Sequence, residues 1–180
     1  MRPTPLTPEH AVALRSFVED FHSNGETSIP AFFQKPHWTH EETVEHFDAW
    51  ARGEPAGWAP EAVSEFVPCT TVFLEDESTG ELVGLFNFRH RLHERLERFG
   101  GHVGYSVRPK ARRRGHGVTL LRAALEFGAR RNLERLVVTC APTNLGSVKV
   151  IERCGGVLRD TYFLEEQDTD VNRYWVPAGV

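Results

Sequence analysis

The chain has 180 residues, 40% of them hydrophobic and 26% charged, which is the composition of an ordinary globular protein. This length predicts a single domain, residues 1–180, with its own hydrophobic core. The formal net charge of −4 argues against a general nucleic-acid-binding protein, which is usually basic overall. We find no run of 18 apolar residues and no apolar signal segment near the N-terminus, so we expect no membrane association.

The cysteines and histidines do not predict a metal site. Cys69, Cys140 and Cys154 are too few and too far apart for a disulfide framework or a zinc site, and they fit a reduced cytoplasm. Four histidines lie in the first third of the chain, but their spacing matches no zinc pattern. We interpret them as surface or core residues: His22, His37, His40 and His46.

The first half of the chain predicts two helices followed by a β-hairpin. Residues 7–22 predict a first helix, because they carry apolar residues at helical spacing after Thr7, a candidate N-cap. A second helix is expected to begin at Thr39, where Glu42 completes a capping box, and to end near Gly53. Two proline-containing stretches predict loops, residues 26–38 and 53–68. Residues 70–75 and 82–90 predict an antiparallel hairpin whose second strand, almost wholly apolar, should be central. Residues 91–100 predict a short helix or an ordered loop.

The second half alternates strands and helices. We expect strands at residues 101–107 and 136–140, with a helix from Val118 between them, and this order predicts a right-handed crossover with parallel pairing. A helix over 147–154 ends at Gly155, and a C-terminal hairpin is expected from the last two strands, residues 157–164 and 172–176.

Residues 101–117, GHVGYSVRPKARRRGHG, predict an anion site. Pro109 should end the strand, and the basic, glycine-containing turn that follows runs directly into a helix. Unpaired N–H groups and the helix dipole attract a phosphate at such a place, and glycine lets it approach the backbone. The P-loop and dinucleotide fingerprints are absent. The alternative is a solvated basic turn that merely caps the helix.

The spacing R-x-x-G-x-G at Arg112, Gly115 and Gly117, after a strand that ends V-x-P, resembles the pyrophosphate loop of the GNAT superfamily of acyl-CoA-dependent N-acetyltransferases. Asn144 and Ser147, in an N-x-x-S segment, resemble a second family element. The resemblance implies an α/β (α+β) fold, with a mixed central sheet of about six or seven strands flanked by about four helices. It also implies acetyl-CoA as co-substrate, bound by Ser106, Val107, Arg112, Arg113, Arg114, Gly115, His116, Gly117, Asn144 and Ser147.

Two departures from the family pattern concern catalysis. Many members carry a tyrosine that protonates the leaving thiolate, and matching spacing places Ile151 there; Tyr162, Ser147 or water are possible substitutes. Many members also carry a glutamate at the position of His102. A histidine suits a general base because its pKa lies near neutrality, and we treat His102 as a candidate base, with a half-exposed strand histidine as the structural alternative.

The resemblance implies direct attack by a primary amine on acetyl-CoA, aided by separation of strands 101–107 and 136–140. Cys140 lacks a visible base partner, so we do not expect it to be a nucleophile. The acceptor is open: a small-molecule or peptide amine, bound by walls that include Phe32, Phe33, Trp38, His90, His93, Glu165 and Glu166. The competing hypotheses are a non-catalytic acyl-CoA-binding module and a nucleic-acid-binding protein that uses residues 110–114. A homodimer is a family-level expectation.

Overall fold

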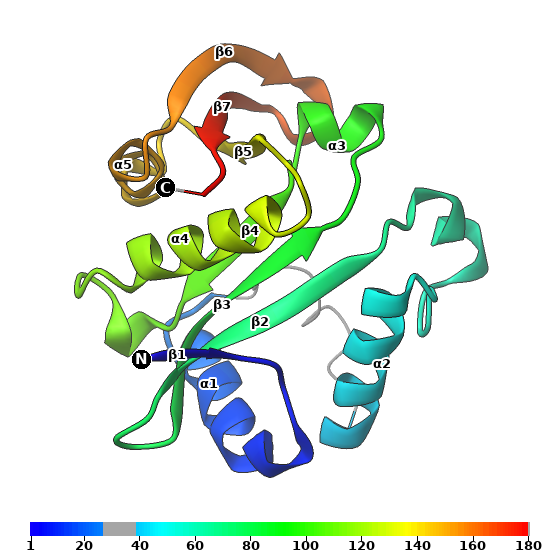
Figure 1. The fold of residues 1–180 in the computed structure, drawn as a ribbon, viewed down its shortest axis with the longest axis vertical. Coiled ribbons are helices and arrows are strands. Elements are labelled where there is room, and N and C mark those ends of the chain that lie inside the picture. Colours follow the sequence, from blue (N-terminus) through cyan, green and yellow to red (C-terminus); the bar gives the residue numbers. More distant parts are fainter. Residues whose placement is uncertain (27–38, 180) are drawn as a thin grey trace.

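The computed structural model describes residues 1–26 and 39–179, so the predicted loop at 26–38 lies, apart from Glu26, outside the described part of the chain. The described residues form five α-helices and seven strands, and the strands are arranged in two sheets (Figure 1). The strands are β1 (Arg2–Thr4), β2 (Cys69–Asp76), β3 (Glu81–Arg89), β4 (Val103–Val107), β5 (Arg135–Cys140), β6 (Val157–Leu164) and β7 (Thr169–Pro177). The α-helices are α1 (Ala11–Ser23), α2 (His40–Arg52), α3 (Glu94–Arg98), α4 (His116–Ala129) and α5 (Leu145–Arg153), and four 3-10 turns join them: Pro8–His10, Pro60–Glu65, Pro109–Ala111 and Glu165–Gln167.

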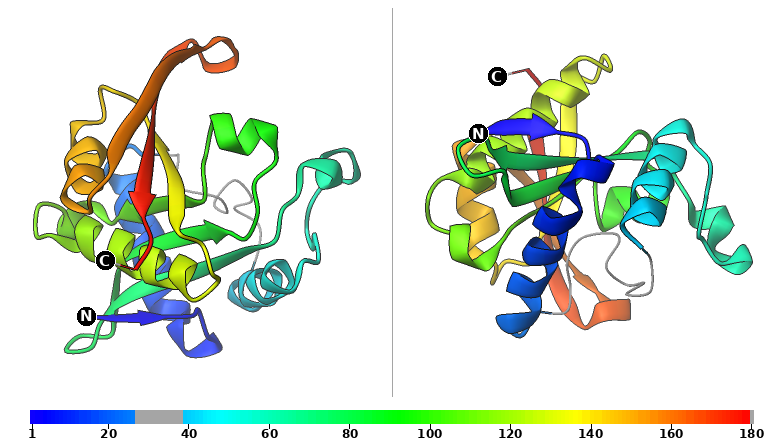
Figure 2. Two further views of the ribbon diagram at one scale, coloured as in Figure 1. Left: turned by 45° about the horizontal axis from the view of Figure 1, so that its top comes forward. Right: turned by 90° about the horizontal axis from the view of Figure 1, so that it is seen from below.

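The first sheet has the antiparallel order β1-β2-β3-β4, and helices cover both of its faces. One core contains Phe17 and Phe21 of α1 and Phe47 of α2, packed against β2 and β3. The other core lies beneath α4 and extends to the second sheet. β3 is buried along nearly all of its length because both faces are covered, which confirms its predicted central position. Figure 2 shows α1 and α2 on one side of this sheet and α4 on the other.

The second sheet, β5-β7-β6, is antiparallel and comes from one continuous segment, Arg135–Pro177. The predicted C-terminal hairpin is therefore confirmed, and β7 lies in the middle. β4 and β5 are edge strands of different sheets, so the prediction of parallel pairing between them is wrong, while their predicted separation is confirmed. The two strands meet near the start of β4, where the N–H of His102 donates to the Val137 carbonyl at 2.8 Å.

Local sequence signals explain most helix boundaries. Thr39 and Glu42 form the predicted capping box, with the Glu42 N–H donating to Thr39 Oγ1 at 3.1 Å and the Thr39 N–H donating to Glu42 Oε2 at 2.7 Å. Gly53 ends α2 at a φ of 93°, a backbone conformation that glycine adopts without steric cost. The predicted starts of α4 and α5 are each two residues late, because Gly115 and Asn144 act as the N-caps. The 53–68 loop contains the 3-10 turn Pro60–Glu65.

Candidate functional site: a cleft at two helix N-termini

The turn between β4 and α4 presents unpaired backbone N–H groups. The strand ends as predicted before Pro109, and the chain then passes through Arg113 at a φ of 64° and Gly115 at a φ of 88° before the first residue of α4. A left-handed conformation at a residue other than glycine costs roughly 1–3 kcal/mol, and such strained residues cluster at functional sites. Five successive backbone N–H groups donate to no acceptor in the described part of the chain: those of Arg113, Arg114, Gly115, His116 and Gly117.

This turn forms one wall of a cleft of about 750 Å³ between β4, α4 and α5. A side chain at Gly115 would meet open space, whereas a Cβ at Gly117 would lie 3.0 Å from Val150. The cleft brings together most of the residues predicted to bind the co-substrate: Ser106, Val107, Arg112, Arg113, Gly115, His116, Gly117, Asn144 and Ser147. Arg114 is exposed and does not line it, and His102 also lies outside it. The lining residues that sequence reasoning missed are Glu26, Tyr105, Val118, Gly146, Lys149, Val150 and Arg153.

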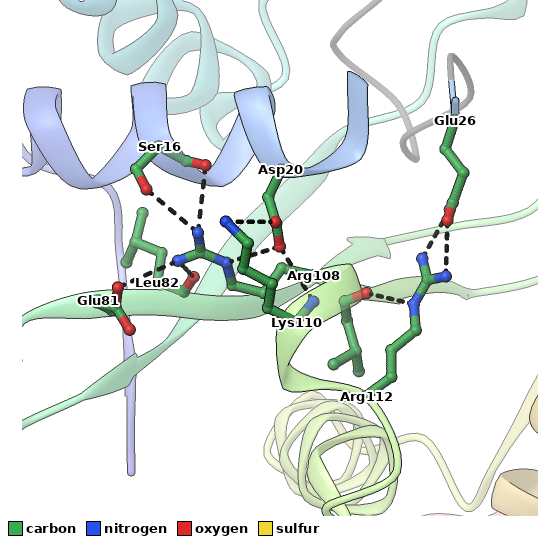
Figure 3. A network of polar contacts seen from close by, with 9 residues as sticks. Ser16, Asp20, Glu26, Glu81, Leu82, Arg108, Lys110 and Arg112 are labelled. Atoms are coloured by element: carbon green, nitrogen blue, oxygen red, sulfur yellow. Dashed lines mark hydrogen bonds and ion pairs between the residues drawn. The ribbon is translucent and has the colours of Figure 1, made fainter. Parts of the chain in front are cut away.

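The basic residues of the turn differ in their pairing (Figure 3). Arg112 makes a two-pronged ion pair with Glu26, in which Nη1 and Nη2 donate to the two carboxylate oxygens at 2.7 and 2.6 Å. Hydrogen bonding to Arg112 lowers the pKa of Glu26, so this carboxylate is charged at neutral pH. Lys110 is paired with Asp20 through both its ammonium group and its backbone N–H, each at 3.1 Å. Arg113, by contrast, lines the cleft without an ion pair to any described residue.

Arg108, the residue before Pro109, holds the turn against α1. Its guanidinium is buried, and Nε donates to Asp20 Oδ2 at 3.2 Å while Nη1 donates to the Leu82 carbonyl at 3.3 Å. Burial raises the pKa of Asp20, but the hydrogen bonds from Lys110 and Arg108 outweigh burial and leave the pKa below its ordinary value. A buried, charged cluster thus fixes the chain immediately before the unpaired N–H groups, and Figure 3 shows Arg108 and Lys110 converging on Asp20.

Asn144 and Ser147 begin α5 on the opposite wall. Asn144 is the N-cap, since its Oδ1 accepts the N–H of Ser147 at 3.0 Å. The Ser147 hydroxyl lies 2.8 Å from the Tyr105 hydroxyl, which comes from β4. Tyr105 could have been anticipated from its place two residues before Val107, on the same strand face. The two helix N-termini and the strand edge therefore converge on the cleft.

His102 is held at the junction of the two sheets. Its Nδ1 accepts the N–H of Val137 at 2.9 Å, and its own N–H donates to the Val137 carbonyl. Burial lowers the pKa of the ring, so His102 is neutral at pH 7 with its proton on Nε2. The lone pair that a base would use is already engaged in this arrangement. The base role of His102 stays a prediction, and the geometry favours the structural alternative.

The other candidate catalytic residues have different surroundings. Ile151 is fully buried in the core beneath α4. Tyr162 lies between the guanidinium groups of Arg98 and Arg173, each 5.5 Å from its ring centre, and its hydroxyl is buried without a hydrogen-bond partner in the described residues. Burial raises the pKa of the Cys140 thiol, which makes it a poorer nucleophile.

A second cavity of about 640 Å³ lies between the turn Pro60–Glu65, α3 and the end of β6. Of the residues predicted to form the acceptor walls, His93, Glu165 and Glu166 line this cavity. His90 is elsewhere, with Nε2 at 2.8 Å from the Thr70 hydroxyl, and Phe32, Phe33 and Trp38 lie outside the described residues. Four glutamates and two arginines line the cavity, so its charge is negative on balance: Glu65, Glu94, Glu165, Glu166, Arg95 and Arg98.

Residues 1–26 and 39–179 contain no helix with the length and hydropathy needed to cross a bilayer. In the same residues, His, Cys, Asp and Glu side chains nowhere gather in threes as potential metal ligands.

A family profile and a curated relative match this chain. The profile of the family described as "Acetyltransferase (GNAT) domain" matches residues 4–157. The "Uncharacterized N-acetyltransferase YnaD" of Bacillus subtilis (strain 168) is 30% identical over 81 residues, 43% of this chain and 46% of that protein, so the match spans about half the length of this curated relative.

Two solved structures show the shared fold. The ribosomal-protein-S5-alanine acetyltransferase from Vibrio fischeri aligns with a TM-score of 0.67 and 16% identity, over 98% of this chain and 91% of that one. A ribosomal L7/L12 alpha-N-protein acetyltransferase in complex with coenzyme A aligns with a TM-score of 0.61 and 18% identity, over 98% of each chain.

Proposed function

The chain belongs to the GNAT acetyltransferase family, and from this premise we propose that it transfers an acetyl group from acetyl-CoA to a primary amine by direct attack in a ternary complex. The observation that carries the proposal is the run of five unpaired N–H groups from Arg113 to Gly117, because four of these five residues line a cleft with basic walls. Such an arrangement suits a pyrophosphate, since it supplies hydrogen-bond donors and positive potential together. GNAT acetyltransferases use acetyl-CoA, and a coenzyme A complex is among the structures with this fold.

The residues of the cleft fit this co-substrate. Gly115 and Gly117 would let a phosphate approach the backbone, and Arg113 and Lys149 would neutralise it. Arg112 would join them by exchanging the Glu26 carboxylate for a phosphate. The edge of β4 that faces away from β3 makes no ladder with another described strand. Because the Arg108 N–H donates to the Val83 carbonyl of β3, the N–H of the preceding residue, Val107, points to the free edge and can bind the arm that carries the thioester.

Direct attack is supported by the state of the available nucleophile. The raised pKa of the Cys140 thiol disfavours an acyl-enzyme on that residue. The amine must reach the thioester in its neutral form, and the developing oxyanion needs a donor, which an unpaired N–H group on the β4 edge can supply. The negative charge of the second cavity favours an amine acceptor that carries further positive charge.

The first experiment is a thermal shift with acetyl-CoA, CoA and ATP side by side. A ligand at about 100 times its Kd stabilises the folded state by about 2.7 kcal/mol, which for a chain of this size raises Tm by roughly 5–10 °C. We expect both CoA species to produce this shift and ATP to produce a smaller one. The variant Gly115→Glu should abolish it, because a carboxylate would point into the phosphate site.

The matched control is Gly80→Glu. Gly80 also has a positive φ and open space around its Cβ position, but it lies in the β2–β3 hairpin turn, outside the cleft. This control separates loss of binding from backbone strain. Thiol release with spermidine, amino acids and peptides with a free N-terminus then identifies the acceptor class. Binding without turnover on any amine would favour the non-catalytic acyl-CoA-binding module, and no shift with either CoA species would refute the proposed function.

A further inference from the structure

The reaction proposed above needs a proton for the departing thiolate, and the helix position that many GNAT proteins use for this cannot supply it. Ile151 has an apolar side chain, is fully buried, and packs against Gly156, whose α-carbon approaches closely. The α5 residues that line the cleft are instead Gly146, Ser147, Lys149, Val150 and Arg153. Of these, Ser147 alone carries a hydroxyl group.

The Ser147 hydroxyl is paired with a second hydroxyl from another element. Tyr105 Oη lies 2.8 Å from Ser147 Oγ and 3.5 Å from the Ser147 carbonyl oxygen. Both residues line the cleft. When Tyr105 donates its proton to Ser147 Oγ, the serine O–H is left free to turn toward the cleft. In this arrangement, one of the two that the distance allows, Tyr105 determines which way the serine proton points.

The backbone around this pair is fixed on both sides. Asn144 caps α5 and accepts the Ser147 N–H, which holds the serine at the helix start. Tyr105 sits within the β3–β4 ladder opposite Phe86, and its ring packs below Gly117, where a Cβ would lie 4.0 Å from the ring. The distance between the two hydroxyl groups is thus set by a strand and a helix N-terminus rather than by a loop.

We propose that Ser147 and Tyr105 form a two-hydroxyl proton relay that protonates the sulfur of the departing coenzyme A, with Ser147 next to the sulfur and Tyr105 behind it. This inference rests on the proposed function. When the carbon–sulfur bond breaks, sulfur keeps the electron pair and takes the proton of Ser147 Oγ, and the Tyr105 proton moves to Ser147. The phenolate then recovers a proton released by the acceptor nitrogen after it has bonded to the acetyl carbon. The sum is amine plus acetyl-CoA giving amide plus CoA thiol.

The surroundings keep Tyr105 a neutral donor before the reaction. Burial raises the pKa of Tyr105, and the hydrogen bond with Ser147 opposes that effect only in part. The titratable groups whose charge would act on the Tyr105 phenol, Cys140 and Cys154, are thiols whose own pKa values are raised by burial, so they are uncharged at neutral pH. The phenol therefore holds its proton until the thiolate develops.

The test is a double-mutant cycle on the thiol-release reaction, run with acetyl-CoA and the fastest amine of the panel described above. Ser147→Ala should lower kcat about 100-fold and Tyr105→Phe about tenfold, within the range of general acid catalysis, while the Kd for acetyl-CoA stays within threefold. The double variant should be no slower than Ser147→Ala, because the two groups act in one relay. Ser147→Thr, which keeps a hydroxyl, should retain more activity than Ser147→Ala.

The other two tyrosines of the chain are the controls. Tyr174→Phe removes a buried hydroxyl from β7, where Asn172 Nδ2 donates to it, and should keep the wild-type kcat. Loss of activity in Tyr162→Phe, with Tyr105→Phe unaffected, would move the acid to β6 and overturn the relay. Multiplicative losses in the double variant would overturn it too, because they show independent roles. If the wild-type protein binds no CoA species or turns over no amine, the proposed function itself fails, and that result differs from a failure seen in the variants alone.

Discussion

Replacing Asp20 by asparagine should destabilise the fold by about 3 kcal/mol. The Asp20 and Arg108 side chains are 3% and 5% exposed, and they are joined at 3.2 Å. Asparagine keeps the shape but leaves the guanidinium without its buried counter-charge; removing one member of a buried pair costs about 3–5 kcal/mol. We take the lower end, because Glu81 lies 3.8 Å from Arg108 and offsets part of the loss. The Lys110 ammonium adds little, since it is 77% exposed.

Urea unfolding followed by circular dichroism measures this loss, and a fall in Tm of roughly 6–12 °C should accompany it. The control is Glu54→Gln, which removes an exposed ion pair with Arg52 and should leave Tm unchanged within error. The pKa of Asp20 in the folded protein is lowered, so its contribution is present above about pH 4, the unfolded value, and disappears as the pH falls through the folded value. A destabilisation below about 1 kcal/mol at pH 7 would refute the reasoning, because the pair would then contribute no more than a surface ion pair.

Three further outcomes are expected. Gly101→Ala should cost about 2 kcal/mol more in unfolding free energy than Gly80→Ala, because both have a positive φ but only the Gly101 Cβ would collide with the Val137 carbonyl; equal costs would contradict this. Glu26→Gln should tighten acetyl-CoA binding by roughly fivefold in calorimetry, about 1 kcal/mol, because Arg112 becomes free to bind phosphate; weaker binding would show that the carboxylate helps. Burial and Arg131 lower the pKa of His90 to about 4, so the unfolded chain takes up a proton between about pH 6.5 and 4 while the folded protein does not. The free energy of unfolding therefore decreases as the pH is lowered from about 6.5 to 4. His90→Gln should flatten this part of the stability profile, and an unchanged slope would assign it to another group.

The sequence predicted the elements that depend on local chemistry. The capping box at Thr39, the end of α2 at Gly53 and the end of β4 before Pro109 are each determined by neighbouring residues, and the structure confirms them. The central position of β3 follows from its nearly continuous apolar run. The family profile bears out the resemblance that was based on the motifs at Arg112 and Asn144.

What the sequence could not predict depends on distant pairing. β1 is a three-residue strand containing Pro3, and it forms only because β2 offers an edge. The separation of β4 from β5 was implied by the family resemblance alone, because an alternation of strands and helices by itself favours parallel pairing. The Glu26–Arg112 pair joins residues 86 positions apart, and Tyr105 meets Ser147 across 42 positions. Both contacts lie in the cleft, and neither can be read from the local sequence.

The meeting of the two sheets near the start of β4 also has a consequence for how the protein opens. The second sheet is one continuous segment, Arg135–Pro177, held to the rest by the shared core beneath α4 and by the junction at His102 and Val137. Proteins open in contiguous cooperative units, and this segment has the boundaries of one. Its amides should exchange hydrogen together, at a lower free energy than those of β3. A ligand that spans the gap between β4 and β5 would connect the segment Arg135–Pro177 to the first sheet and slow its hydrogen exchange. Binding of the co-substrate would then be measurable as slower amide exchange in the distant strands β6 and β7.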